Sequence, residues 1–506
     1  MAVPMTPGRP DAFASRADKL RFLLQAPEDA RVVLLGGYWQ SQRSDFSAAG
    51  FRILSDLALT TGQPCYLFLD TRDGIGHLLP TLAASQGQLM GVVAAVRVPR
   101  VRGVRYLAKF SDRLRASGLG ESTQFEVDAL GGGMDELRRL PMPPPDSRGL
   151  RKRLQALRRG PLPHLSFFGP TGTSELPGLH LAEIEAATMA GLTSRLWAAQ
   201  VWFRRRGALV IRLDTGIGEE SLFLRVATNS EVDAHLSGNQ RFVDHLLATP
   251  SLSAETRRLV PTQLGHRASG GADLYLEAGF AGQMAWTLET DSDLRARIDQ
   301  DLYRFSTGLQ REAGHRERLS GERLTRWITD YLGPLPERLR DMGLEDAALG
   351  GVVSQIHRLR EGRSWWLAPA HGDFGSGNAL VRPDGQLTGI IDWDTHAEED
   401  LAGLDWCDHR LKALRFRKAD WPGRLGALIE QAIAHGMLAP EYQGFGRADF
   451  GLDRSAMVLL PCLAYLRILI REARYPSGLR LDPGAYRRAL AMVGRHLTAA
   501  PDPEPA

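Results

Sequence analysis

Two short apolar runs in the C-terminal half of the chain, residues 379–382 and 387–391, are separated by the sequence PDGQ. Proline, aspartate and glycine together are typical of a tight turn, so the two runs are predicted to pair as an antiparallel β-hairpin. Asn378 precedes the first run and Asp392 follows the second. The hairpin should therefore return these two side chains to the same end, where neighbouring strands lie about 4.8 Å apart.

The side chains at this end of the hairpin carry oxygen ligands. The amide oxygen of Asn378 and the carboxylate of Asp392 are within reach of one hard cation, and Mg²⁺ binds such ligands while keeping several waters. Asp373 lies five residues before Asn378, in a loop rich in glycine. A carboxylate there can face the cation without serving as one of its ligands. It can then accept a proton from a hydroxyl that attacks a phosphoryl group, a reaction that depends mainly on positioning and charge neutralisation.

The segment 371–393 reads His-Gly-Asp, four residues, Asn, and later an apolar strand that ends in Asp-Trp. This pattern resembles the aminoglycoside phosphotransferase/choline kinase family, which has a protein-kinase-like fold. The resemblance covers roughly residues 165–500 and is strongest at 371–393. It implies that the chain uses ATP and Mg²⁺ as cofactors.

The same resemblance implies roles for individual residues. Asp373 corresponds to the catalytic base, and Asn378 and Asp392 correspond to the metal ligands. His371 corresponds to a structural histidine that holds the loop. A further aspartate of the family opens the next helix; Asp405 is the candidate, one residue later than the family pattern.

Upstream of this motif the chain departs from the family. The lysine that holds nucleotide phosphates is matched by Arg225, and the helix glutamate that pairs with it is matched by Gln240 or, as a second choice, by Asn239. A planar guanidinium does not replace an ammonium group freely, and Arg225 could equally be an ordinary surface residue of a strand. Glu277 lies where the family contacts adenine through its backbone, so no role is assigned to its side chain.

The length of 506 residues predicts at least two domains. Strand-like runs at 31–37, 65–70 and 91–96 alternate with helical stretches, which indicates an α/β module with a partly parallel sheet. No GxGxxG motif is present, so we interpret this module as degenerate Rossmann-like, without a cofactor. The predicted division is an α/β domain of unknown role at 16–140, a proline-rich and basic linker at 141–160, and a protein-kinase-like α+β bilobal domain at 161–500. Its small lobe would span about 165–285 and its helical large lobe about 286–500.

Composition limits the partners that can be expected. The formal net charge is only +3, which gives no broad basic field and no case for nucleic acid as a partner.

Cys65, Cys407 and Cys462 are far apart, as expected of buried or free thiols in a reducing compartment. The apolar run 457–470 is too short to cross a bilayer and is predicted to be a core helix. No signal peptide is visible at the N-terminus, so we expect a cytoplasmic protein.

Three functional hypotheses follow. The first is an active kinase that phosphorylates a hydroxyl of a sugar, an amino alcohol or an aminoglycoside-like compound. The second is a nucleotide-binding pseudokinase that regulates or scaffolds, with an unknown partner for the N-terminal domain; the departures at Arg225 and Gln240 favour it. A third, methyltransferase-like chemistry at the N-terminus, has little support because the glycine motif is absent.

Overall fold

The structure, a computed structural model, describes the chain in stretches with gaps between them. The described residues are 16–27, 29–35, 37–54, 65–70, 89–96, 119–127, 136–139, 164–170, 176–194, 196–203, 208–215, 221–288, 291–344, 347–413, 429–430, 450, 452–474 and 483–502. The chain divides into two compact units, and we describe each by itself. Unit 1 comprises Met1–Ser237 and Gln263–Gly279, and unit 2 comprises Gly238–Thr262 and Phe280–Ala506. The predicted linker at 141–160 lies outside the described residues.

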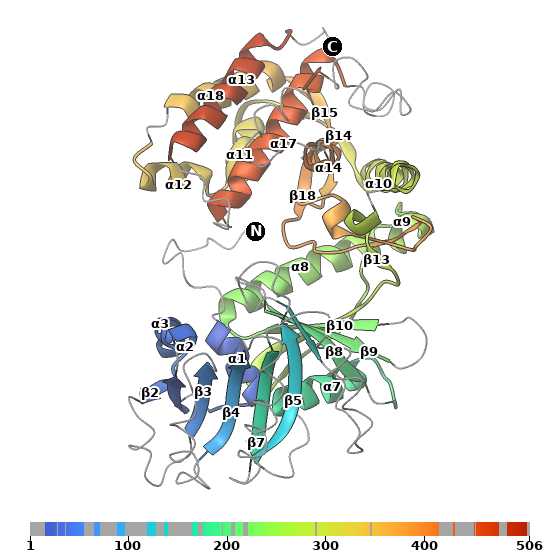
Figure 1. Cartoon of the computed structure of the whole chain (residues 1–506). Coiled ribbons are helices and arrows are strands. Elements are labelled where there is room, and N and C mark those ends of the chain that lie inside the picture. The colour runs from blue at the N-terminus through green and yellow to red at the C-terminus, as the bar shows by residue number, and fades with distance from the viewer. Residues whose placement is uncertain are drawn as a thin grey trace. The chain divides into compact units, whose positions relative to one another are not determined.

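Unit 1 is built on one twelve-stranded sheet with the strand order β11-β12-β10-β9-β8-β6-β5-β7-β4-β3-β1-β2 (Figure 1). The strands are β1 (Arg31–Leu35), β2 (Arg52–Leu54), β3 (Cys65–Asp70), β4 (Leu89–Val96), β5 (Leu119–Val127), β6 (Glu136–Arg139), β7 (His164–Pro170), β8 (Trp197–Phe203), β9 (Leu209–Asp214), β10 (Ser221–Ala227), β11 (Gln263–Ser269) and β12 (Ala272–Ala278). Strands β2, β1, β3 and β4 pair in parallel, and every other pair in this sheet is antiparallel. The predicted strands β1, β3 and β4 and the partly parallel sheet are therefore confirmed. The Rossmann-like interpretation of this module stays a prediction.

The sheet joins strands that the sequence assigned to two domains. β6 from the predicted N-terminal domain pairs with β8 from the predicted small lobe, and Phe68 and Leu224 belong to one buried cluster. The described helices of the unit are α1 (Arg16–Leu24), α2 (Gly37–Gln40), α3 (Arg43–Ala48), α7 (Pro177–Met189) and the first part of α8 (Ser230–Ala248). Helix α7 approaches α1 so closely that a Cβ at Gly178 would overlap the carbonyl of Phe22. One sheet and one core thus unite the N-terminal strands with those preceding α8.

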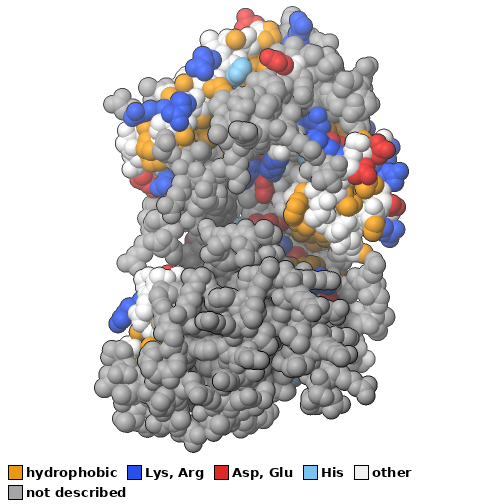
Figure 2. All heavy atoms as spheres, viewed as in Figure 1, with side chains coloured by type: hydrophobic (Ala, Val, Ile, Leu, Met, Phe, Trp, Pro, Cys, Tyr) orange, Lys and Arg blue, Asp and Glu red, His pale blue; other side chains and the backbone are white. Residues whose placement is uncertain are grey.

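Unit 2 combines helices with two three-stranded sheets, β13-β16-β17 and β14-β15-β18. Its strands are β13 (Gln283–Met284), β14 (His315–Leu319), β15 (Arg363–Ala370), β16 (Ala379–Val381), β17 (Leu387–Ile390) and β18 (Ala397–Leu401). Its described helices are α9 (Ala254–Arg257), η4 (Ala285–Leu288), α10 (Ser292–Ala313), α11 (Gly321–Leu332), α12 (Leu335–Asp341), α13 (Ala347–Arg360), η5 (Ser376–Asn378), α14 (Leu404–Ala413), α17 (Arg454–Arg474) and α18 (Pro483–Ala499). Figure 2 shows basic and acidic side chains interspersed on the visible surface of this unit.

The core of unit 2 follows the apolar periodicity of its helices. Val352, Ile356 and Leu359 are fully buried on one face of α13, as their spacing predicts. The apolar run 457–470 lies within α17, and all of its residues are buried, so the predicted core helix is confirmed. Within the described part of the chain, none of the helices has the length and apolar character that crossing a bilayer requires. The three cysteines are buried free thiols, as expected.

Candidate active site

The predicted hairpin is present and places two candidate metal ligands together. Strands β16 and β17 are antiparallel, with Ala379 opposite Ile390. Just beyond that pair, the Ile391 amide donates to the carbonyl of Asn378 at 2.9 Å. This bond ties the two strand ends together, so Asn378 and Asp392 lie at the same end of the hairpin.

The backbone and side chains at this end suit a hard cation. Asp392 has a φ of 67°, in the left-handed region that residues other than glycine adopt rarely and often at functional sites. The side-chain amide nitrogen of Asn378 donates to the carbonyl of Asp373 at 2.9 Å and to its Oδ2 at 3.2 Å. These bonds orient the amide so that the Asn378 Oδ1 remains as its ligand atom. An amide oxygen and a carboxylate are a donor set that fits Mg²⁺.

His371 connects the loop to the end of the hairpin. Its imidazole is fully buried; Nε2 lies 2.9 Å from the carbonyl of Ile391, and Nδ1 accepts from the Asp373 amide at 3.3 Å. Burial lowers the pKa of His371, which favours a neutral ring that donates from Nε2 and accepts at Nδ1. At Gly372, which has a φ of 81°, a Cβ would collide with the carbonyl of Thr395. The loop conformation therefore depends on both His371 and Gly372.

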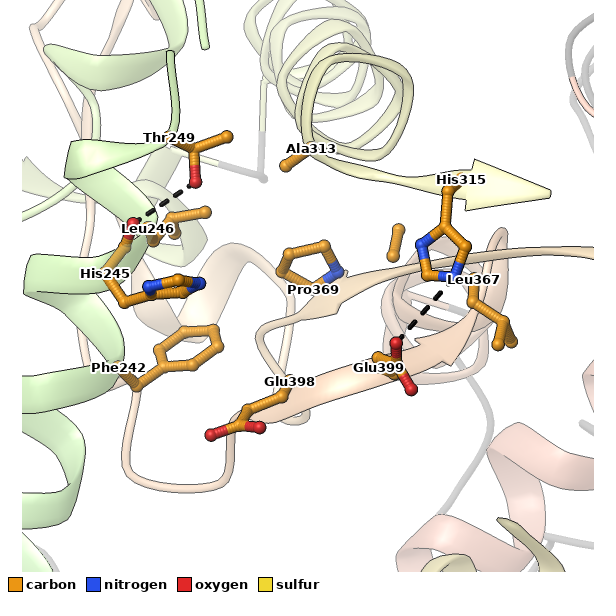
Figure 3. A pocket seen from close by; sticks show the side chains of 11 residues that line it. Phe242, His245, Leu246, Thr249, Ala313, His315, Leu367, Pro369, Glu398 and Glu399 are labelled. Carbon is orange, nitrogen blue, oxygen red and sulfur yellow. Dashed lines mark hydrogen bonds and ion pairs between the residues drawn. The ribbon is translucent and has the colours of Figure 1, made fainter. Parts of the chain in front are cut away.

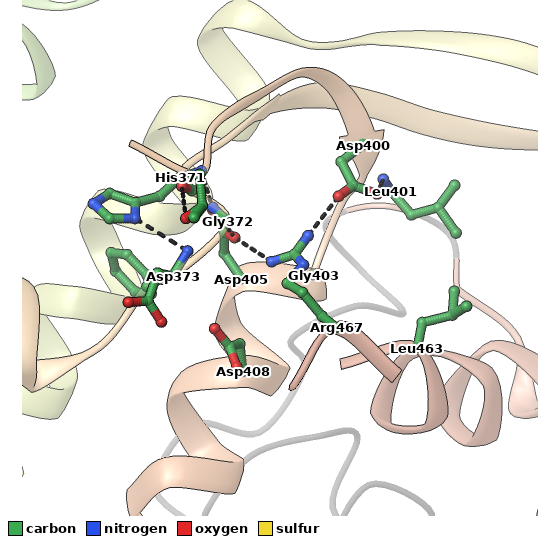
Figure 4. Close-up of polar contacts among 12 residues, drawn as sticks. His371, Gly372, Asp373, Asp400, Leu401, Gly403, Asp405, Asp408, Leu463 and Arg467 are labelled. Carbon is green, nitrogen blue, oxygen red and sulfur yellow. Dashed lines mark hydrogen bonds and ion pairs between the residues drawn. The ribbon is translucent and has the colours of Figure 1, made fainter. Parts of the chain in front are cut away.

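Asp405 fastens the same loop from the first turn of α14. Its carboxylate accepts from the backbone amides of His371 at 2.6 Å and Gly372 at 3.1 Å (Figure 4). Arg467 of α17 donates to Asp405 at 2.7 Å and also pairs with Asp400 of β18. All three charged side chains are at most 7% exposed. Asp405 thus anchors the loop from a buried position in the first turn of α14.

Three residues that the sequence reasoning missed surround Asp373. Lys412 Nζ lies 2.6 Å from Asp373 Oδ1, 3.0 Å from the carbonyl of Phe374 and 2.9 Å from Asp408. Arg471 also pairs with Asp373 and donates from NH2 to Asp408 at 2.8 Å. Asp408 is fully buried. Lys412 and Arg471 therefore each pair with two carboxylates, the buried one of Asp408 and the accessible one of Asp373. Arg471 lies one helical turn after Arg467 in a mostly apolar helix. Because arginine is rarely buried without a partner, these two residues were a sequence signal that could have predicted buried carboxylate partners.

These charges determine the protonation of Asp373. Burial alone would raise the pKa of Asp373, but the charges of Lys412 and Arg471 outweigh it and lower the pKa to about 2. The side chain is nevertheless 37% exposed, so a second molecule can reach it. Asp373 is consequently an ionised carboxylate, accessible and held in a fixed position, throughout the physiological pH range.

The upstream candidates are arranged differently from the expectation. In unit 1, Arg225 Nε lies 3.0 Å from Glu277 Oε1, and the two side chains are only 12% and 10% exposed. Arg225 is therefore not an ordinary solvated strand residue, and Glu277, which had no assigned side-chain role, is its partner. In unit 2, Asn239 is buried and its amide nitrogen lies 3.4 Å from Asp394 Oδ1, next to the metal-ligand loop. Gln240, the first choice from the sequence, is half-buried.

Comparisons with known proteins give matches among solved structures alone. No protein-family model matches the chain, and no curated protein sequence matches it. A putative fructosamine-3-kinase from Haemophilus somnus 129PT is similar at 9% identity and a TM-score of 0.39, over 62% of this chain and 96% of that chain. An aminoglycoside-3'-phosphotransferase of type VIII is similar at 17% identity and a TM-score of 0.29, over 57% and 90%. WbdD is similar at 8% identity and a TM-score of 0.27, over 96% and 92%.

The chain is thus similar to phosphotransferases and small-molecule kinases, the class that the pattern at 371–393 predicts. In this chain the loop that carries Asp373 and the end of the hairpin lie together. That geometry unites an accessible carboxylate with two further oxygen ligands.

Proposed function

We propose that the chain is an ATP- and Mg²⁺-dependent phosphotransferase that moves the γ-phosphate to a hydroxyl of a small molecule, such as a sugar, an amino alcohol or an aminoglycoside-like compound. The observation that carries the proposal is the joining of Asp373, Asn378 and Asp392 at one end of the hairpin. Asn378 contacts Asp373 directly, and the Ile391–Asn378 hydrogen bond brings Asp392 beside them. The similarity of the chain to kinases is consistent with the proposal.

In this proposal Asn378 Oδ1 and the Asp392 carboxylate would hold Mg²⁺. The ion, when bound, would neutralise charge on the nucleotide phosphates. Asp373 orients the acceptor hydroxyl and takes its proton. A carboxylate with a pKa of about 2 is a weak base, so it takes the proton late, when the hydroxyl oxygen has already begun to bond to phosphorus. Such late transfer suits the loose transition state of phosphoryl transfer.

A pseudokinase is the second candidate function. The specific observation that favours it is the position of the Arg225–Glu277 pair: Glu277 lies on the neighbouring strand β12, whereas the carboxylate partner in the family pattern lies on a helix. Incubation of the full chain with ATP, Mg²⁺ and a panel of sugars, amino alcohols and aminoglycosides, read by mass spectrometry, separates the two. A phosphorylated product supports the transferase. ATP binding without any product across the panel supports the pseudokinase.

The metal ligands should differ in their contribution to magnesium dependence. We expect Asp392→Ala and Asn378→Ala both to raise the Mg²⁺ concentration needed for half-maximal activity, with Asp392→Ala the more damaging. The carboxylate supplies a charge as well as a ligand atom, whereas the amide supplies only a dipole. The measurement is a Mg²⁺ titration of ADP formation. Asp384→Ala, at the opposite end of the same hairpin, is the control, and equal Mg²⁺ dependence in all four proteins would contradict the metal assignment.

The pH dependence of transfer should reveal the influence of Lys412 on Asp373. The folded-state pKa of Asp373 is lowered, so the wild-type base stays ionised as the pH falls to about 2. Removing the Lys412 charge in Lys412→Met moves this pKa up toward the ordinary value of an aspartate near 3.9. We therefore expect kcat/KM of Lys412→Met to decline at a higher pH than that of wild type. Lys412→Arg retains the charge and should follow wild type; superimposable profiles of Lys412→Met and wild type would exclude this electrostatic role.

A further inference from the structure

Unit 2 contains a cavity of about 390 Å³ that the proposed transfer reaction does not use. Its wall combines the C-terminal half of α8, the end of α10 and the strands β14, β15 and β18 (Figure 3). This volume lies within the range of small-molecule sites, roughly 300–1,000 Å³. Figure 3 shows Phe242 and His245 of α8 on one side of the cavity and Glu398 and Glu399 of β18 on another.

One part of the wall is apolar and fixed. Leu246 and Leu367 are 1% and 0% exposed, and Pro369 lies between α8 and β18 in Figure 3. Phe242 is held by its stacking on His396, with the ring centroids 4.1 Å apart. An apolar ligand body placed here would contact side chains that are already positioned, so little ordering would oppose its binding.

The opposite part of the wall carries more carboxylates than cations. Glu317 and Glu399 flank His315, whose Nε2 lies 3.7 and 3.8 Å from them, and Arg323 donates to both glutamates. Within the described stretches, no basic side chain contacts the carboxylate of Glu398. The cavity lining itself holds two carboxylates, Glu398 and Glu399, and Arg323 pairs with Glu399.

The two parts of the wall together indicate a ligand with a positive charge at one end and an apolar body at the other. We propose that the cavity is a binding site for an organic cation, an amine or substituted ammonium compound, whose charge pairs with Glu398. A bare metal ion suits it less well, because Arg323 already donates to both oxygens of Glu317 at 3.0 and 2.9 Å.

The site adjoins the segments that carry the proposed chemistry but is separate from them. Pro369 precedes His371 by two residues at the end of β15. Phe242 lies against Trp393, with ring centroids 5.9 Å apart, and Trp393 directly follows Asp392. An occupant of the cavity therefore contacts side chains that support both the loop and the hairpin end, and binding there does not depend on phosphoryl transfer.

Phenethylamine and 2-phenylethanol are a matched pair of probes, because they share a body and differ in charge. We expect titration calorimetry of the full chain, at pH 8, low salt and with EDTA present, to show that the amine binds about fivefold or more tightly than the alcohol. Glu398→Gln should weaken amine binding by about fivefold, the size of one partly exposed ion pair, and leave alcohol binding unchanged. Glu337→Gln removes an exposed glutamate of α12 outside the cavity and should bind the amine like wild type.

A second variant tests the cavity itself. Ala313→Trp fills it from the end of α10 and should abolish binding of both probes while its far-ultraviolet circular dichroism stays that of wild type. Equal affinity for the amine and the alcohol, amine binding unaffected by Glu398→Gln, or no amine binding to wild type would each overturn the proposal.

Discussion

Asp373→Asn is expected to slow phosphoryl transfer by about 10²–10⁴-fold while nucleotide affinity stays close to that of wild type. Asparagine keeps the shape of the side chain, and its Oδ1 can still accept from Lys412, which lies 2.6 Å from that position. The substitution removes the group that takes the hydroxyl proton, together with the negative charge that pairs with Lys412 and Arg471 and the Oδ2 that accepts from Asn378. Pre-steady-state measurement of product formation, with nucleotide affinity from an independent titration, separates the two effects.

Asp330→Asn serves as the matched control, because Asp330 is an exposed aspartate on α11. Its rate of transfer should equal that of wild type. Turnover of Asp373→Asn near the wild-type rate would show that Asp373 is not the base. A parallel loss of nucleotide affinity would show instead that the substitution had disturbed the loop.

Arg467→Met should cause the largest loss of stability among single substitutions near the site. Arg467 pairs with Asp405 at 2.7 Å and with Asp400, and the whole triad is almost inaccessible to solvent. Burial alone would lower the pKa of Arg467, but the two carboxylates outweigh it and raise the pKa, so the arginine is charged in the core. Methionine would leave two carboxylates buried without a cation. Breaking such a pair costs about 3–5 kcal/mol of the free energy of unfolding.

Thermal unfolding measures this prediction, and for a unit of this size the loss corresponds to a fall in Tm of roughly 10 °C. Arg454→Met, at an exposed position in the first turn of the same helix, should change Tm by little. Because Asp405 also holds the amides of His371 and Gly372, activity should be lost at a lower temperature than in wild type. Equal melting of the two methionine variants would mean that the triad does not stabilise the fold.

The local features of the site could be predicted from the sequence because they depend on residues close together in the chain. The PDGQ turn and the two apolar runs specify the hairpin, and the hairpin alone brings Asn378 and Asp392 together. The period of the apolar residues in α13 specifies its buried face in the same way. The catalytic and metal-binding roles of these residues stay predictions.

Features that depend on distant pairing could not be predicted. Lys412 and Arg471 reach Asp373 from helices 39 and 98 residues away, and no local pattern specifies that meeting. Glu277 meets Arg225 through the pairing of β12 with β10, 52 residues apart in the chain. The continuous sheet of unit 1 likewise depends on the pairing of strands that are far apart in the chain. The change in sequence pattern near the proline-rich segment does not show which strands pair.

Formation of ADP from ATP without an added acceptor tests the central claim most directly, because water can slowly replace the unknown hydroxyl compound. We expect wild type to form ADP in the presence of Mg²⁺, to stop when the ion is chelated, and to lose most of this activity in Asp373→Asn and in Asp392→Ala. ADP formation that is equal in wild type and both variants, or that continues after chelation, would contradict the assignment of the residue 371–393 segment as a magnesium-dependent phosphotransfer site.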